Sequence, residues 1–135
     1  MKYLLDTNVI IDLMRNREKS VAENLMAVGV SQCCMSDITL YELYCGAQMA
    51  ENVEQEVKKI DRMASVITIV STTDAMKHAA FQKGYLKRRG TLVEDFDLII
   101  GAAAIVNDLI LVTANTQHMN RLAGIKLEDW RISIH

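Results

Sequence analysis

The chain has 135 residues, of which 50% are hydrophobic and 24% charged, as is typical of one globular domain, here residues 1–135, that folds without disulfides. A net charge of −2 and a pI near 5.9 exclude a surface that is basic throughout, but they allow a local basic patch. No apolar run is long enough to span a membrane, and Asp6 and Asp12 interrupt the first one where a signal peptide would continue, so we expect a cytoplasmic protein.

The first predicted element is a short buried strand at residues 3–5, which stops at Asp6. Thr7 and Asn8 then turn the chain and cap a helix that starts near Val9. In open α/β sheets the functional crevice lies at the carboxyl ends of the strands, so Asp6 is a candidate site residue. The alternative is that Asp6 only caps the helix or completes the turn.

The next segments predict a helix at residues 20–28 capped by Ser20, and a strand at residues 32–36. The helix that follows the strand carries Glu42 in an early turn. A glutamate there gains from the helix dipole, which is a purely structural explanation. Its neighbours on the same face, Thr39 and Gly46, are small and would leave room for a ligand.

The middle of the chain predicts an amphipathic surface helix at residues 51–64, a β-branched strand at 66–70 and a helix that starts at 72–74. The last of these helices ends in a basic cluster around Tyr85. Cations at a helix C-terminus are favoured by the dipole alone, but such a cluster beside an aromatic ring also suits RNA. The basic cluster consists of Lys83, Lys87, Arg88 and Arg89.

The segment after this cluster predicts a buried helix with Asp95 and Asp97 at its start. Because residues i and i+2 point in different directions on a helix, only one of the two acids is expected to face the same crevice as Asp6. Gly101, one turn later, suits close backbone packing. The next strand, at residues 109–112, ends at Thr113, so that Thr113 occupies a strand end like that of Asp6.

Three further features complete the pattern. Asn115 follows the last long strand and suits a helix cap, and the C-terminal tail predicts an edge strand anchored by Trp130. The cysteines are odd in number and lack zinc-site spacing, which predicts reduced, partly buried thiols. The three cysteines are Cys33, Cys34 and Cys45.

Alternating strands and helices predict an α/β fold with a central parallel sheet and helices on both faces. In that arrangement Asp6, Glu42 and Asp97 are expected to converge. Carboxylates forced together repel one another unless a cation neutralises them, and oxygen ligands suit Mg²⁺ or Mn²⁺. The chemistry expected of such a site is metal activation of water and in-line attack on a phosphodiester.

Four motifs in this order and spacing resemble the PIN-domain family, and in particular the VapC-type toxins of VapBC toxin–antitoxin systems. The motifs are LLDTNVIIDLM, ITLYELYCGA, EDFDLIIGAAAIV and LILVTANTQHMNRLAGIKLEDW. The resemblance implies a three-layer PIN-like fold with a mainly parallel sheet of four to five strands. It also implies a Mg²⁺- or Mn²⁺-dependent endoribonuclease in which Asp6, Glu42 and Asp97 are the catalytic, metal-binding acids.

The resemblance further implies that Asn8 of the D-T-N motif and Thr113 and Asn115 of the T-x-N motif support the site. Many relatives carry a fourth acid three residues after that asparagine, where this chain has His118. Asp95 is a candidate replacement for the missing metal ligand. His118, like the basic cluster, is a candidate contact for RNA.

The implied partners are an RNA substrate, either transfer or ribosomal RNA, a small VapB-type antitoxin that occludes the acids, and a second copy in a homodimer. A haloacid dehalogenase-type phosphotransferase would need an aspartate where this chain has Asn8, and a receiver domain would need an early acidic pair. A non-catalytic PIN-like RNA- or protein-binding module is the remaining alternative. The presence of all three acids argues against it.

Overall fold

The computed structural model describes residues 1–135 and contains one five-stranded, fully parallel sheet with the strand order β3-β2-β1-β4-β5. The first strand lies at the centre, and later strands were added on both of its sides. The order in which strands are added to the sheet therefore reverses between β1 and β4. In open α/β sheets, ligands bind at such a reversal. The strands are β1 (Tyr3–Leu5), β2 (Cys33–Ser36), β3 (Thr68–Val70), β4 (Ile110–Val112) and β5 (Leu127–Glu128).

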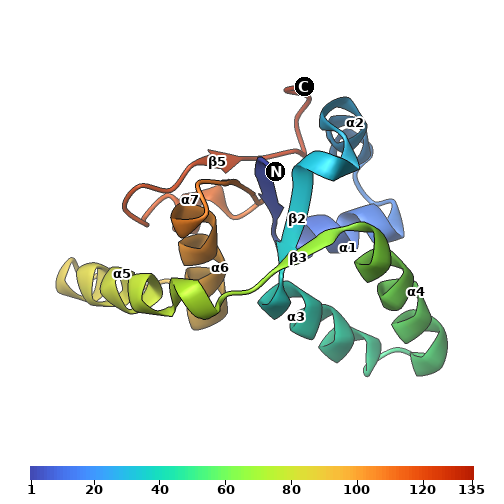
Figure 1. Cartoon of the computed structure of the whole chain (residues 1–135), viewed down its shortest axis with the longest axis horizontal. Helices are drawn as coiled ribbons and strands as arrows, with labels where there is room; N and C mark the ends of the chain where they lie inside the picture. Colours follow the sequence, from blue (N-terminus) through green and yellow to red (C-terminus); the bar gives the residue numbers. More distant parts are fainter.

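Helices cover both faces of this sheet, as expected (Figure 1). One group, α1 to α4, lies on one side of the strands in the view of Figure 1, and α5 to α7 lie on the other. The helices are α1 (Thr7–Arg15), α2 (Lys19–Val28), α3 (Asp37–Ala47), α4 (Val53–Val66), α5 (Met76–Arg88), α6 (Asp95–Val106) and α7 (Thr116–Met119), with short 3₁₀ turns η1 (Val30–Gln32) and η2 (Thr73–Ala75).

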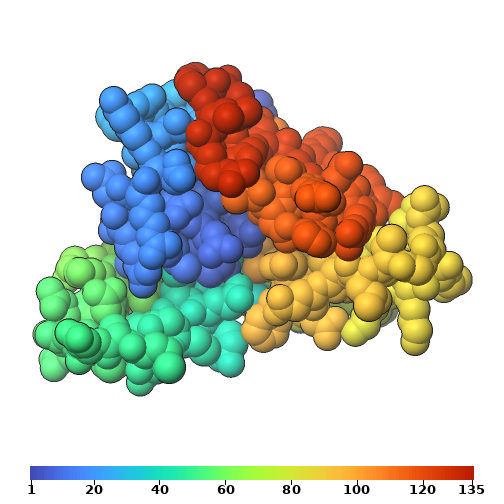
Figure 2. All heavy atoms as spheres, turned by 180° about the vertical axis from the view of Figure 1, so that it is seen from behind, coloured from blue at the N-terminus to red at the C-terminus, as the bar shows by residue number.

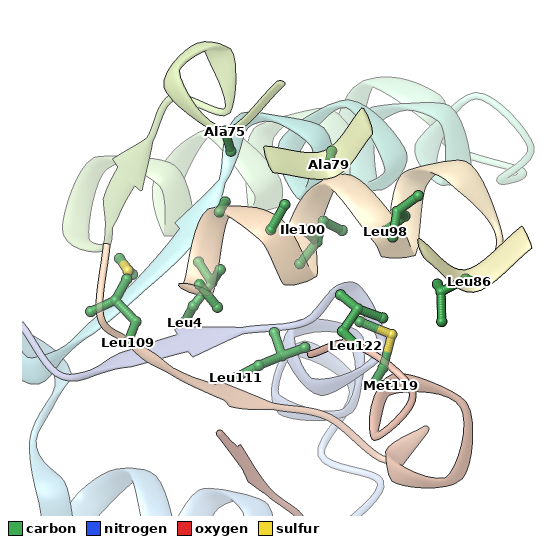
Figure 3. Packing of buried hydrophobic residues seen from close by; sticks show 14 residues of the cluster. Leu4, Ala75, Ala79, Leu86, Leu98, Ile100, Leu109, Leu111, Met119 and Leu122 are labelled. Atoms are coloured by element: carbon green, nitrogen blue, oxygen red, sulfur yellow. The ribbon is translucent and has the colours of Figure 1, made fainter. Parts of the chain in front are cut away.

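Alternation along the central strand divides the interior into two cores. Leu4 packs with residues of α5 and α6, and Figure 3 shows it beside Ile100 of α6 and Leu111 of β4. Tyr3 and Leu5 point to the opposite face and pack with residues of α1 to α4. Because successive side chains of a strand face opposite ways, a strand of three apolar residues serves both cores, and the three-layer arrangement is confirmed.

Several element boundaries differ from the prediction. Helix α1 begins at Thr7 because Asp6 itself is its N-cap. Helix α2 begins at Lys19 after Glu18, whose side chain forms no capping bond, so the predicted Ser20 cap is wrong. Val66 is the last residue of α4, and the third strand therefore starts two residues later than expected.

The C-terminal tail is held by buried polar and aromatic side chains. Trp130 is fully buried, as predicted, and its ring centroid lies 5.3 Å from that of Tyr3. Buried Asn24 of α2 binds the tail through its amide: Nδ2 donates to the carbonyls of Trp130 and Ile132, and Oδ1 accepts the N–H groups of Ile134 and His135. The sequence pattern gave no sign of this contact.

The cysteines are free thiols, in agreement with the prediction. Cys33 and Cys34 are buried in β2, and burial raises the pKa of both thiols to about 11, whereas Cys45 is exposed. No helix combines the length and the apolar character that crossing a membrane requires.

Candidate active site

Asp6 lies at the carboxyl end of β1 and is 8% exposed. Its Oδ1 accepts the N–H of Thr7 at 2.8 Å, which caps α1, and its Oδ2 accepts the hydroxyl of Thr113 at 2.8 Å. Burial raises the pKa of Asp6, and these two hydrogen bonds partly offset the rise. The helix-cap explanation and the site explanation thus hold for the same carboxylate.

Glu42 faces Asp6 from α3 through a chain of hydroxyl groups. Thr7 donates a hydrogen bond of 2.6 Å to Oε1 of Glu42, and its oxygen lies 3.0 Å from the hydroxyl of Thr39. Because an ionised carboxylate only accepts, the hydrogen of Thr7 is committed to Glu42, and Thr39 must donate to Thr7. Ser36, the N-cap of α3, donates in turn to Thr39. Sequence reasoning missed Thr7, which links the two acids.

Asp97 lies in the first turn of α6 and is half-buried. The pKa of Asp97 is raised to about 6. Burial is the largest cause, followed by the negative charges of Asp6, Glu94 and Glu42, in this order. Helices α3 and α6 are also braced by an edge-to-face contact of Tyr41 with Phe96, whose centroids are 5.8 Å apart. The structure therefore brings Asp6 and Glu42 within electrostatic range of Asp97.

The strand end of β4 completes the site. The hydroxyl of Thr113 accepts the N–H of Asn115 at 3.0 Å while it donates to Asp6. Asn115 in turn accepts a hydrogen bond of 2.7 Å at Oδ1 from Nδ1 of His118. A depression of about 270 Å³ beside these residues is lined by Leu92, Val93, Glu94, Asp97, Asn115 and His118.

Comparison with known proteins finds the PIN-domain family and VapC relatives along nearly the whole chain. The PIN domain matches residues 3–125. The chain belongs to the PIN-domain family, as a VapC-type ribonuclease toxin. The tRNA(fMet)-specific endonuclease VapC of Shigella flexneri is 33% identical over 96% of this chain and 98% of the relative, and ribonuclease VapC2 of Haemophilus influenzae is 32% identical over the same shares.

Solved VapBC structures confirm the fold of this VapC-type toxin. A chain of the DNA-bound VapBC of Salmonella typhimurium superposes with a TM-score of 0.89 at 31% identity, over 96% of this chain and 98% of that one. A chain of VapBC-1 from nontypeable Haemophilus influenzae reaches 0.87 at 30% identity, over 98% and 100%. Function as a ribonuclease toxin of a toxin–antitoxin system follows from this family membership.

The acids of this VapC-type site suit a divalent cation in their chemistry. None of Asp6, Glu42, Glu94 and Asp97 forms a salt bridge with a basic side chain. No three acidic, histidine or cysteine side chains are close enough to form a closed metal cage by themselves. Mg²⁺ does not need such a cage, because it keeps several waters and takes only one or two carboxylates.

Two residues predicted for the site are not brought into it. Asp95 forms a salt bridge of 2.8 Å with Lys83 on the surface, and both side chains are more than half exposed. Asn8 is exposed on α1 and forms no hydrogen bond with the acids, so Thr7 takes the supporting role expected of it. The acid next to Asp97 is instead Glu94, which sequence reasoning missed although it directly precedes the helix.

The basic cluster lies at the C-terminal end of α5, which projects at one edge of the toxin (Figures 1 and 2). Lys87, Arg88 and Arg89 are exposed there, and the guanidinium of Arg89 lies 5.1 Å from the centroid of the Tyr85 ring. Lys83 is engaged by Asp95. In Figure 2 this end, coloured yellow, adjoins the amber segment that contains the start of α6.

Proposed function

We propose that this VapC-type toxin hydrolyses RNA phosphodiester bonds with Mg²⁺ or Mn²⁺, and that Asp6, Glu42 and Asp97 hold the cation, one or two of them directly and the rest through its water ligands. The observation that carries the proposal is that Asp6, Glu42 and Asp97 lie together at one end of the sheet without a basic partner. Asp97 has its pKa raised by burial and by the charges of Asp6 and Glu42, and no lysine or arginine pairs with any of the three. A divalent cation relieves the repulsion among these charges and favours the ionised forms.

The chain's own residues prepare the site for this chemistry. A bound divalent cation would lower the pKa of a coordinated water and stabilise charge on the phosphate. Thr113 and Thr7 fix both oxygens of Asp6, and Thr7 also fixes Glu42, so these carboxylates are held before substrate arrives. Asp97, which lacks such hydrogen bonds, is the carboxylate free to exchange a proton for a cation.

The test is cleavage of RNA by the purified protein with Mg²⁺ or Mn²⁺, compared with the same reaction in excess EDTA. Asp97→Asn is expected to lower the cleavage rate at least about 100-fold while circular dichroism remains unchanged. Asp95→Asn, at the first residue of the same helix, is the matched control and should retain cleavage. Cleavage that persists in EDTA would reject the metal mechanism.

We propose transfer RNA as the substrate class. The relative from Shigella flexneri is named as a tRNA(fMet)-specific endonuclease, and exposed Lys87, Arg88 and Arg89 provide phosphate contacts at the edge of the toxin. Sequencing the fragments produced from total RNA tests this proposal. Fragments that derive from ribosomal RNA alone would reject it.

We propose that a small VapB-type antitoxin neutralises the chain and that the toxin is a homodimer. Relatives of known structure are VapBC complexes. A groove of about 400 Å³ between α1, α3 and α4 borders Glu42; its walls include Ile11, Met14 and Ile60, with Arg15 and Lys59 at polar positions. An apolar segment with acidic residues would fit this groove and cover Glu42.

Growth of a bacterial host tests the antitoxin proposal. Expression of the chain alone should arrest growth, whereas Asp6→Ala, or co-expression of the neighbouring small open reading frame, should not. Growth arrest by Asp6→Ala would favour the alternative of a non-catalytic binding module. Sedimentation velocity of the purified toxin tests the homodimer.

A further inference from the structure

A buried side chain of α5 holds the segment that follows α7. Gln82 is 0% exposed, and its amide binds both polar groups of one residue of that segment. Its Oε1 accepts the N–H of Ala123 at 3.0 Å, and its Nε2 donates to the carbonyl of Ala123 at 2.8 Å. Because oxygen and nitrogen of the amide each have a partner that the other could not serve, the orientation of the Gln82 amide is fixed.

His78 receives the remaining hydrogen of this amide. It lies one helical turn earlier on α5, is half-buried, and its Nε2 is 3.0 Å from Nε2 of Gln82. An amide nitrogen only donates, so Nε2 of His78 must accept, and the hydrogen of the ring must be on Nδ1. The arrangement therefore requires a neutral imidazole.

Protonation of His78 would place two donors against each other. An imidazolium carries a hydrogen on both ring nitrogens, so its Nε2 no longer accepts from Gln82. A Gln82 amide turned by half a rotation would accept from the imidazolium, but its oxygen would then face the carbonyl of Ala123 and its nitrogen the N–H. In either orientation, at least one hydrogen bond is lost when His78 is charged.

The segment that Gln82 holds is continuous with the active site. Leu122 lies next to Ala123 and is buried together with Met119, the last residue of α7 (Figure 3). His118, the residue before Met119, lines the depression that also contains Asp97. Movement of the backbone at Ala123 is therefore transmitted through one buried turn to a wall of the site.

Other ionisable groups on the elements around His78 do not bind its imidazole. Apart from the Lys83–Asp95 pair, they are Asp74 of η2, Lys77 of α5, Asp97 of α6, and Asp108, Arg121 and Lys126 on the segments that follow. Lys126 is paired with Asp108, and Arg121 donates to a backbone carbonyl. Asp74 lies one turn before His78 and Gln82 one turn after it, so attraction to Asp74 draws a charged ring away from Gln82.

We propose that His78 and Gln82 form a pH-sensitive latch on the α7 side of the active site. Neutral His78 orients the Gln82 amide, and the amide holds Ala123 in place. Histidine changes its charge between about pH 5 and pH 8, and protonation of His78 in this range weakens the hold. The latch involves no metal and no partner, so it does not depend on the proposed catalytic chemistry.

Nitrogen-15 NMR of the labelled full-length chain tests the required tautomer. At about pH 7.5, we expect a hydrogen on Nδ1 of His78 and none on Nε2. A hydrogen on Nε2, or equal populations of the two tautomers, would overturn the proposal, because Nε2 would then not accept from Gln82.

Hydrogen exchange at the Ala123 N–H measures the hold itself. Its protection factor in the unmodified chain is expected to fall about fivefold between about pH 7.5 and pH 5.5, which corresponds to the loss of one hydrogen bond. His78→Gln provides an accepting amide oxygen at every pH and should show a much smaller fall. An unchanged protection factor in the unmodified chain, or an equal fall in the variant, would overturn the latch. Thermal unfolding at both pH values confirms that the variant is folded.

RNA cleavage tests whether the latch acts on the site. The site carboxylates titrate in both proteins, so their effect cancels in the ratio of the cleavage rate of His78→Gln to that of the unmodified chain. We expect this ratio to rise about threefold or more between about pH 7.5 and pH 5.5. A ratio that does not vary with pH would reject the link between the latch and the site. Failure of both proteins to cleave would reject the proposed function, while the exchange measurement still decides the latch.

Discussion

Thr113 donates a hydrogen bond of 2.8 Å to the buried carboxylate of Asp6, a residue 107 positions earlier in the chain. The bond joins the carboxyl ends of β4 and β1, the two strands between which the winding of the sheet reverses. Because the Thr113 oxygen also accepts the N–H of Asn115, its hydrogen is directed at Asp6. One hydroxyl therefore orients the central acid of the site.

Thr113→Val should remove the hydrogen bond that orients Asp6, with little change in the volume of the side chain at position 113. A buried carboxylate that loses its donor costs roughly 1–3 kcal/mol in the free energy of unfolding. We also expect the cleavage rate to fall at least about tenfold, because Oδ2 of Asp6 is no longer held. Urea denaturation and RNA cleavage measure the two effects. Thr113→Ser keeps the hydroxyl and is the control; a serine variant as impaired as the valine variant would contradict the hydrogen-bond explanation.

The stability of the metal-free protein should depend on pH through Asp97. Its folded-state pKa of about 6 lies above the ordinary value, so the folded state binds more protons than the unfolded state between about pH 4 and pH 6. The contribution of Asp97 to the free energy of unfolding is therefore fully present below about pH 4 and is lost as the pH rises through about 6.

Asp97→Asn isolates this contribution. Because its side chain carries no charge, the variant should be more stable than the unmodified chain at pH 7.5, by about 1 kcal/mol once solvent screening of a half-buried group is allowed for. The gain should disappear near about pH 4. Urea denaturation in EDTA at both pH values measures it, and a gain that does not vary with pH would show that repulsion is not its cause.

Gly101 allows α6 to pack closely on the last residue of α7 and the segment that follows it. A methyl group at this position would lie 2.6 Å from Cδ2 of Leu122 and 2.8 Å from Cε of Met119, and both of these side chains are buried. Gly101→Ala should therefore lower the free energy of unfolding by roughly 1–3 kcal/mol despite the better helix propensity of alanine.

Gly46→Ala is the matched control for Gly101→Ala. Gly46 lies within α3, and a methyl group there would meet no atom within 4 Å. That variant should be up to about 1 kcal/mol more stable than the unmodified chain. Thermal unfolding of the two variants measures the difference. Equal changes in melting temperature would show that close packing at Gly101 does not limit stability.

The end of α5 should contribute to RNA affinity in a salt-dependent way. Replacing Lys87, Arg88 and Arg89 by alanine removes three exposed cations, which should weaken RNA binding and reduce the slope of log affinity against log salt by about 2. Fluorescence anisotropy with a labelled transfer RNA at several salt concentrations measures the slope. Lys58→Ala/Arg62→Ala on α4 is the control surface, and an equal effect there would reject a specific role for α5.

The sequence by itself determined the layers of this protein and three of its acids. Apolar alternation and helical periodicity depend on which side chains a segment must bury, and that is a local property, so the strands and most helices were predicted within a few residues. Asp6 and Asp97 could be recognised because each stands at the end of an apolar segment or at the start of one. Glu42 was a candidate because the small residues beside it, Thr39 and Gly46, leave room for a ligand, and the family motifs supported it.

Only the tertiary structure decided which polar neighbours serve those acids. Thr7 rather than Asn8 reaches Glu42, Glu94 rather than Asp95 stands beside Asp97, and Asn24 secures a tail 106 to 111 residues away. In the first two cases, adjacent residues of similar chemistry point in different directions because the chain turns at the start of a helix. Which of them faces the site depends on how that helix is rotated against its neighbours, and packing between distant segments sets that rotation.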